Sequence, residues 1–197
     1  MRFVLATANP DKAAEIQAIL GAGIDLVPRP HTAPDVVESG HTLEDNARLK
    51  AVALVEWTGE AAIADDTGLE VDALGGEPGV YSSRYAGEGA SYADNVAKLL
   101  RELGDGAERR ARFRTVAVAR FPDGREVIAD GVVEGAITRQ ARGDGGFGYD
   151  PVFAPDEGGG RTFAEMSADE KHAISHRGRA FRALAGRLAG GGSSTPR

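Results

Sequence analysis

The first residues of the chain alternate strand and helix, and this order constrains the fold more than any other feature of the sequence. An apolar run at residues 2–6 leads into Asn9-Pro10, an N-cap followed by proline at the first helical position. Apolar residues then recur at helical spacing over residues 10–20, and glycines separate this helix from a short strand at 24–27. Such an opening is typical of an α/β fold.

The second half of the chain adds a hairpin. Two runs rich in β-forming residues, 111–121 and 126–137, are joined by Pro122-Asp123-Gly124, which has the composition of a tight turn. We expect these two strands to be antiparallel neighbours. Together with the α/β opening, they predict a mixed β-sheet flanked by helices.

Three further helices are expected. One begins at Thr42-Leu43-Glu44-Asp45, after a proline-containing loop at 29–40, and runs to about residue 57; another runs from about residue 92 to 103. A capping box, Ser167-Ala168-Asp169-Glu170, begins a last helix. The apolar stripe of that helix consists of Ile174, Phe181, Leu184 and Leu188.

The composition excludes several classes of protein. The 197 residues include no cysteine, which rules out disulfides, thiolate nucleophiles and cysteine-based metal sites. The net charge of -7 gives no support to a duplex-coating DNA binder or to a binder of anionic membranes. No segment approaches the ~20 apolar residues of a membrane span, so we expect a soluble, cytoplasmic protein. One domain should cover residues 1–189, followed by a disordered Gly/Ser-rich tail at 190–197.

The first candidate site lies where the opening strand turns into a helix. Free backbone N–H groups and the helix dipole favour phosphate at such a point, and Lys12 adds a full positive charge. The chain has only four lysines, so a lysine at this helix start is less expected by chance than it would be in a lysine-rich chain. The alternative is a plainly capped helix with a solvated lysine. The candidate residues are Thr7, Ala8, Asn9, Pro10, Asp11 and Lys12.

The second candidate is Asp65-Asp66, which follows a short buried strand expected at residues 61–64 and precedes glycine-rich turns. Two adjacent carboxylates favour a bound cation, and Mg²⁺ prefers carboxylate oxygen together with water and phosphate. Neighbouring side chains on an extended segment point to opposite sides, so one aspartate would face the metal and the other would hold the loop. Glu38 is a possible second ligand. The alternative is an ordinary acidic turn.

The third candidate is the glycine-rich segment 143–151. It matches G-x-G-x-x-G formally, but an extended segment follows at Asp150-Pro151 where a dinucleotide fingerprint requires a helix. We therefore reject a Rossmann site. Glycines around Phe147 and Tyr149 could bring either ring onto a nucleotide base, and an aromatic plug under the loop is the alternative.

The fourth candidate is the segment 171–177. On one continuous helix His172 and His176 are a turn apart and could hold a metal, but the glutamate of an H-E-x-x-H site is missing. His176-Arg177 could donate hydrogen bonds to a purine with oxygen at position 6. Lys171 would share a face with Arg177 only if the helix begins late or bends.

Taken together, these segments resemble the inosine triphosphate pyrophosphatase family, also called Ham1-like or RdgB-like proteins. The match is in order along nearly the whole chain, to about residue 189. It comprises Leu5 to Lys12 with Glu15, Asn46-Ala47 with Lys50-Ala51, Ala64 to Leu69, Gly75 to Gly87, Gly145 to Phe153, and Ser175-His176-Arg177-Gly178.

The resemblance implies a homodimeric α/β enzyme with an elongated mixed sheet and a nucleotide cleft between two lobes. Such an enzyme hydrolyses nucleoside triphosphates to monophosphate and pyrophosphate with Mg²⁺, and prefers ITP, dITP and XTP. Its role is house-cleaning, since it keeps these non-standard purines out of DNA and RNA. Neither nucleic acid nor membrane is an expected partner.

The resemblance also implies roles for the candidate residues. Thr7 to Lys12 would bind the triphosphate, Asp66 would be the catalytic carboxylate at the metal, and Glu38 would be a second metal contact. Thr67 would touch substrate; the family often has serine there, and threonine keeps the hydroxyl. The base would be enclosed by Phe147, Gly148, Tyr149, Asp150, Lys171, His176 and Arg177.

Three other functions compete with this interpretation. A nucleotide-binding sensor needs no catalysis, although the aspartate pair speaks against it. A Maf-like nucleotide pyrophosphatase prefers other bases, and Ser175-His176-Arg177 favours the purine-directed family over it. A histidine-based metal hydrolase is the third.

Overall fold

The computed structural model describes residues 1–106 and 108–190, which divide into two compact units. Unit 1 comprises Met1–Asp66, Thr115–Gly131 and the described residues from Arg177 onward. Unit 2 comprises the described residues of Thr67–Arg114 and Val132–His176. The three long strands, β3 (Ala62–Val71), β5 (Arg110–Arg120) and β6 (Glu126–Ile137), contribute residues to both units.

The strands form one mixed sheet in the order β2-β1-β3-β5-β6-β7, and β4 pairs with β3. The short strands are β1 (Arg2–Leu5), β2 (Asp25–Val27), β4 (Pro78–Gly79) and β7 (Phe153–Pro155). Strand β1 runs parallel to β2 and β3, whereas β4 is antiparallel to β3 and β7 to β6. Strands β5 and β6 are neighbours joined by a short turn, which requires the predicted antiparallel pairing. The expected α/β class with a mixed sheet is confirmed.

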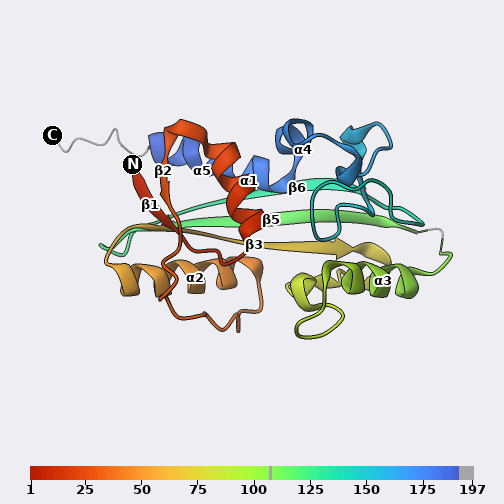
Figure 1. The fold of residues 1–197 in the computed structure, drawn as a ribbon, viewed down its shortest axis with the longest axis horizontal. Coiled ribbons are helices and arrows are strands. Elements are labelled where there is room, and N and C mark those ends of the chain that lie inside the picture. Colours follow the sequence, from red (N-terminus) through yellow and green to blue (C-terminus); the bar gives the residue numbers. More distant parts are fainter. Residues whose placement is uncertain (107, 191–197) are drawn as a thin grey trace. The chain divides into compact units, whose positions relative to one another are not determined.

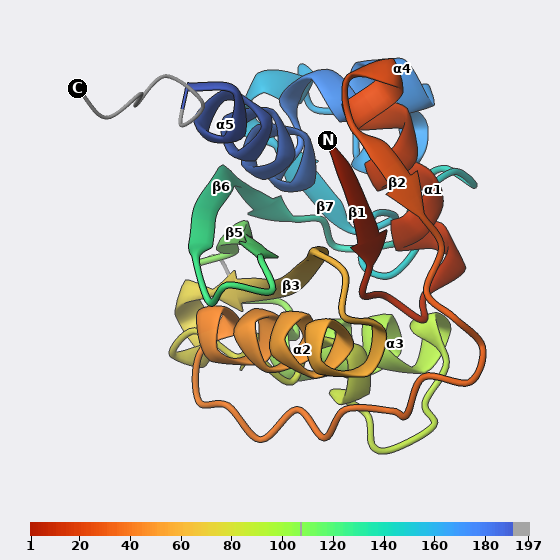
Figure 2. The ribbon, with the colours of Figure 1, turned by 90° about the vertical axis from the view of Figure 1, so that its left-hand side faces the viewer.

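In unit 1 the sheet is covered on both faces (Figures 1 and 2). Helix α2 (Leu43–Thr58) lies on one face, and α1 (Pro10–Leu20) and α5 (His176–Gly190) lie on the other. The core on the α1 and α5 side includes Phe3, Ile16 and Phe181, all at most 1% exposed. Burial of such side chains, at roughly 25 cal/mol per Å² of apolar surface, holds the helices against the strands.

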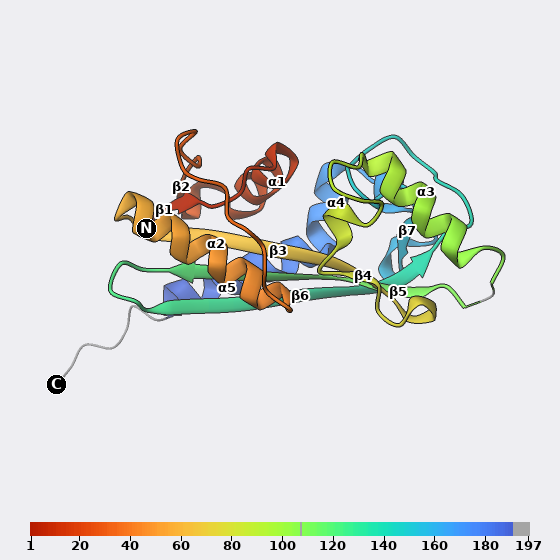
Figure 3. The ribbon, with the colours of Figure 1, turned by 90° about the horizontal axis from the view of Figure 1, so that it is seen from below.

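In unit 2, α3 (Tyr92–Leu103) and α4 (Ala168–Ile174) lie on opposite faces of the strands (Figure 1), and Figure 3 shows the α3 side of the molecule from below. The core contains the rings of Phe113, Phe153 and Phe163, and the Phe113 and Phe153 centroids are 4.8 Å apart. Edge contacts of this kind suit aromatic quadrupoles.

Both units also contain short 3-10 helices. They are η1 (Gly21–Gly23) in unit 1, and η2 (Asp72–Leu74), η3 (Ser82–Arg84), η4 (Asp156–Gly158) and η5 (Phe163–Glu165) in unit 2.

The prediction of a short strand at 61–64 is wrong. Strand β3 continues through the aspartate pair and Gly68 to Val71. Its first residues pair with β1, and Leu69 and Glu70 pair with β4, so ladder hydrogen bonds carry the strand across a composition typical of turns. Asp65 and Asp66 therefore lie in the middle of a strand and not at its end.

The prediction of one continuous last helix is also wrong. Ser175 has φ -66° and ψ 155°, an extended conformation that separates α4 from α5. His172 and His176 are consequently on different helices, which removes the helical spacing on which the histidine metal site depends. Within 1–106 and 108–190, no group of three or more His, Asp or Glu side chains could hold a metal ion by itself.

Two further expectations concern the chain's end and membranes. Gly190 is the last residue of α5, and residues 191–197 lie outside the described part of the chain, so the disordered tail stays a prediction. Among the described helices, none is both long and apolar enough to cross a membrane.

Candidate functional site

Asp65 and Asp66 are both buried in the centre of β3, with exposures of 2% and 6%. As neighbours on an extended strand, they point to opposite faces of the sheet, as expected. Asp65 contacts side chains of α1 and α5, whereas Asp66 contacts side chains of α2. The two carboxylates thus belong to different clusters of unit 1.

Asp65 is surrounded by positive charge. Its Oδ2 atom lies 3.3 Å from Lys12 Nζ and 3.7 Å from Arg177 Nε. Burial opposes ionisation of this carboxyl, but Lys12, Arg177 and Lys50 outweigh it and lower the pKa of Asp65 to about 2. Arg177, 2% exposed, also forms an ion pair with Glu15. Asp65 is an ionised anchor for two cations, and it lies within β3 and not at the start of a loop.

The start of α1 is built as a capped helix. Asn9 Oδ1 accepts hydrogen bonds from the N–H groups of Asp11 (2.9 Å) and Lys12 (3.2 Å), and Thr7 Oγ1 accepts one from Asn9 (3.1 Å). These N–H groups are therefore not free, contrary to the prediction for a phosphate cradle. The lysine is not solvated either, since it is paired with Asp65, and burial lowers its pKa.

Asp66 is held by two side chains of α2. Lys50 Nζ lies 3.0 Å from Asp66 Oδ1, and Asn46 Nδ2 donates to Asp66 Oδ2 at 3.3 Å. The same Lys50 ammonium donates to Glu38 Oε1 at 3.1 Å. Burial raises the pKa of the Asp66 carboxyl in spite of the nearby lysines. The structure thus brings together Glu38 and Asp66, the two predicted metal ligands.

The contacts of Lys50 test whether these residues suit Mg²⁺. Two carboxylates from separate segments converge on a single positive charge, the Lys50 ammonium. Mg²⁺ at nucleotide sites takes one or two carboxylates from the protein and fills its remaining positions with phosphate oxygens and water. Glu38 and Asp66 fit that requirement.

A second cluster, in unit 2, contains predicted base contacts. Lys171 Nζ lies 2.5 Å from Asp150 Oδ2, both side chains are buried, and the same oxygen accepts the Phe147 N–H at 2.8 Å. The ammonium is 4.9 Å from the centroid of the half-buried Phe147 ring. A Cβ at Gly146, where φ is +69°, would come 2.1 Å from Asp150 Oδ2, so this loop needs glycine.

Two other predicted base contacts are core side chains. Tyr149 is 4% exposed, and its hydroxyl donates to Ser82 O at 2.9 Å. The His176 ring is stacked on Phe113 with centroids 4.5 Å apart. Of the two aromatic rings proposed to meet a base, Phe147 is the more accessible, and Tyr149 corresponds to the aromatic plug. Thr67 and Gly148 are half-buried, on β3 and on the glycine-rich loop.

Sequence reasoning missed three residues of the unit 1 clusters as site residues: Glu15, Asn46 and Lys50. All three belong to the segments that carry the family resemblance, and the scarcity of lysine was a further indication for Lys50. Their contacts join residues far apart in the chain, such as Glu15 with Arg177 and Asn46 with Asp66.

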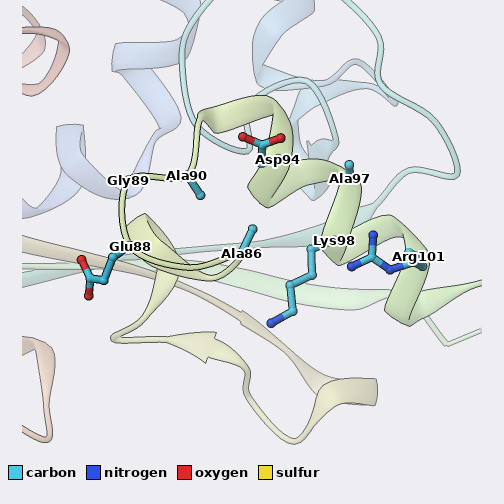
Figure 4. A pocket seen from close by; sticks show the side chains of 8 residues that line it. All are labelled: Ala86, Glu88, Gly89, Ala90, Asp94, Ala97, Lys98 and Arg101. Atoms are coloured by element: carbon cyan, nitrogen blue, oxygen red, sulfur yellow. The ribbon is translucent and has the colours of Figure 1, made fainter.

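A depression of about 410 Å³ lies on unit 2, beside α3 (Figure 4). It is lined by residues 86 and 88–90 together with Asp94, Ala97, Lys98 and Arg101. Its charge is mixed, and none of the predicted site residues lines it. It therefore gives no support to any of the predicted roles.

Comparison with known proteins agrees with the fold. The model of the Ham1 family matches residues 3–187. The dITP/XTP pyrophosphatase of Chlorobaculum tepidum is 48% identical, over 94% of this chain and 92% of that protein, and the one of Streptomyces coelicolor is 49% identical, over 93% and 94%. The structure of a HAM1 protein from Coxiella burnetii superposes with a TM-score of 0.87 at 41% identity, over 96% of this chain and 99% of that one. The chain belongs to the Ham1 family.

Proposed function

We propose that this protein is a nucleoside-triphosphate pyrophosphatase that converts dITP, XTP and ITP to the monophosphate and pyrophosphate. In the cell it keeps these non-standard purine nucleotides out of DNA and RNA. Relatives named dITP/XTP pyrophosphatase support this activity over more than nine tenths of the chain. The observation that carries the proposal is the pair Glu38 and Asp66, which converge on one cation.

Glu38 and Asp66 would hold Mg²⁺, which supplies charge neutralisation at phosphate oxygens. The residues of the chain supply the rest. Asp66 orients a water molecule and accepts its proton as the water oxygen bonds to the α-phosphorus. The bond from that phosphorus to the bridging oxygen breaks, and pyrophosphate leaves with the electron pair.

The cations of unit 1 would stabilise the charge that develops on the phosphates. Lys12 and Lys50 are half-buried and held in place by Asp65 and by the Glu38–Asp66 pair, so they need no reorganisation during the reaction. Arg177 is proposed to act by holding Asp65, because its Nε atom lies 3.7 Å from Asp65 Oδ2 and its guanidinium also pairs with Glu15, a second carboxylate of unit 1.

Base selection is proposed for the unit 2 cluster. Phe147 offers a ring face for stacking, and the Lys171 ammonium beside it is a hydrogen-bond donor. An oxygen at purine position 6 accepts such a bond, whereas the amino group of adenine cannot. The family resemblance further supports a homodimer in the cytoplasm, acting on free nucleotides.

The test is hydrolysis of dITP, XTP, dGTP and dATP side by side, with Mg²⁺ or with EDTA, measuring pyrophosphate separately from orthophosphate. We expect metal-dependent release of pyrophosphate, fastest from dITP and XTP. Orthophosphate as the direct product would place cleavage at the γ-phosphate and contradict the mechanism. Tight binding without turnover would favour a sensor, and a preference for other bases would favour a Maf-like specificity.

A further inference from the structure

Asn46 is fully buried on the first turn of α2, and both ends of its side-chain amide are used. Its Oδ1 atom accepts the backbone N–H of Gly40 at 2.8 Å. Its Nδ2 atom donates to Asp66 Oδ2 at 3.3 Å. One buried amide therefore joins the loop that carries Glu38 to the carboxylate of Asp66.

Lys50 lies one helical turn after Asn46, on the same face of α2. It contacts the other oxygen of Asp66 and also Glu38. Each oxygen of Asp66 is thus bound by a different side chain of α2. The asparagine side chain is shorter and stiffer than the lysine side chain, because the lysine reaches its partners through a flexible four-carbon chain.

The loop also approaches α2 closely at Gly40. A Cβ at this residue would come 2.6 Å from Asp45 Cβ and 2.7 Å from Asn46 Oδ1. Contacts this short do not occur between real side chains, so the observed hydrogen bond requires glycine at position 40. Glu38 is two residues away, and its backbone position follows from this contact.

We propose that Asn46 is a positioning residue that fixes the separation of Glu38 and Asp66 and thereby sets the affinity of the site for its divalent cation. The inference rests on the proposed function, since it assigns the two carboxylates to a metal. Groups that orient metal ligands typically change metal affinity by roughly 10- to 100-fold when they are removed. Loss of the amide leaves both carboxylates in place but frees the loop.

Asn95 provides a matched control in unit 2. It is 2% exposed, lies on the first turn of α3, accepts the Ala86 N–H at 2.7 Å and donates to Ser83 O at 3.2 Å. Asn46→Ala and Asn95→Ala each remove a buried amide that links a helix to a loop. Only the first removes a bond to a carboxylate.

The experiment measures two quantities for both variants: the Mg²⁺ concentration that gives half-maximal dITP hydrolysis, and hydrogen exchange of the peptide containing Gly40. We expect Asn46→Ala to raise the half-maximal Mg²⁺ concentration about tenfold or more, with a smaller loss of kcat at saturating Mg²⁺. Its Gly40 peptide should exchange faster. Asn95→Ala should leave both quantities at the wild-type value while lowering Tm.

Two more variants keep the test decisive if Asn46→Ala folds poorly. Gly40→Ala displaces the loop with Asn46 intact and should raise the Mg²⁺ requirement in the same way. Asn46→Asp keeps an acceptor for the Gly40 N–H and should retain slow exchange of that peptide.

An unchanged Mg²⁺ requirement in Asn46→Ala, or unchanged exchange at Gly40, would overturn the proposal. If the wild-type protein releases no pyrophosphate at any Mg²⁺ concentration, the proposed function fails. The exchange comparison still tests the link between Asn46 and the loop in that case.

Discussion

Helices α2 and α3 begin with the same arrangement of side chains, but these side chains bind different partners. Each is preceded by a Thr or Ser cap, has an aspartate three residues later and an asparagine next, as in Thr42-Leu43-Glu44-Asp45-Asn46 and Ser91-Tyr92-Ala93-Asp94-Asn95. In both, the asparagine accepts a loop N–H and a lysine of the following turn contacts the same region. A capped helix start is a convenient place from which to hold a loop.

The asparagine and lysine side chains of the two helices donate to different kinds of acceptor. In α2 the asparagine and Lys50 donate to carboxylates, Asp66 and Glu38. In α3 the asparagine donates to Ser83 O, and Lys98, shown in Figure 4 beside the 86–90 loop, donates to Tyr85 O at 2.7 Å. The backbone carbonyls at α3 carry no net charge, whereas the two carboxylates at α2 carry the negative charge that a divalent cation needs. The comparison therefore separates a structural loop anchor from one proposed to serve chemistry.

The largest effect is expected at the carboxylates. Asp66→Asn keeps the side-chain shape but removes the charge and the proton acceptor, so kcat for dITP should fall by about 10²- to 10⁴-fold with little change in nucleotide affinity. Glu102→Gln removes the carboxylate that lies 3.7 Å from Lys98 and should leave kcat within about twofold. Steady-state kinetics at saturating Mg²⁺ measures both, and near wild-type turnover of Asp66→Asn would exclude its catalytic role.

The lysines come next. Lys50→Met removes a half-buried charge between two carboxylates. We expect kcat/KM for dITP to fall by about 100-fold, the size of a lost electrostatic contact to the reacting phosphates. Lys98→Met loses one backbone hydrogen bond and a contact with the Tyr85 ring at 4.1 Å, which costs about 1–2 kcal/mol of stability. Equal losses of kcat/KM in the two variants would show that α2 and α3 do not differ as described.

A smaller effect concerns pH. The folded pKa of Asp65 is about 2, below its ordinary value of 3.8, so its contribution to stability is complete above pH 4 and is lost as pH falls toward 2. The difference corresponds to about 2 kcal/mol. Asp65→Asn should flatten the fall in unfolding free energy between pH 4 and pH 2, as measured with urea.

The exposed cap aspartate of α3 is the control for this pH dependence. Hydrogen bonds from Ser91 lower the pKa of Asp94, but solvent screens this carboxylate, so Asp94→Asn should change the acid slope far less than Asp65→Asn. A steeper loss in Asp94→Asn would contradict the assignment of the acid dependence to buried charge.

The parts of the fold that sequence reasoning predicts well are those with local end signals. The bounds predicted for α1 and α3 agree with the structure, because Asn9-Pro10 and Ser91 mark their starts and glycines follow their ends. The length of β3 and the break at Ser175 are not predictable in this way. The first depends on pairing with β1 and β4, and the second separates Lys171, which pairs with Asp150, from Arg177, which pairs with Glu15.

The same limit applies to the site. Glu38 and Asp66 could be proposed from the preference of Mg²⁺ for carboxylate oxygen and from the family resemblance. Asn46 could not, since asparagine near a helix start usually forms a cap. Its role depends on two contacts that only the folded chain provides, one to Gly40 and one to Asp66.

The smallest effect is expected from the caps themselves. Thr42→Ala and Ser91→Ala each remove a side chain that accepts an N–H three residues later, at 3.1 and 3.2 Å, and each should cost about 1 kcal/mol of stability in urea titrations. After Ser91→Ala, Asp94 still accepts the backbone N–H of residue 91, so α3 keeps part of its cap. Thr42→Ala loosens the turn that carries Asn46 and should raise the half-maximal Mg²⁺ concentration by about twofold, a fraction of the tenfold shift typical of a lost orienting group. An identical Mg²⁺ requirement in Thr42→Ala and Ser91→Ala would mean that Asn46 is held by its own hydrogen bonds, independently of the helix start.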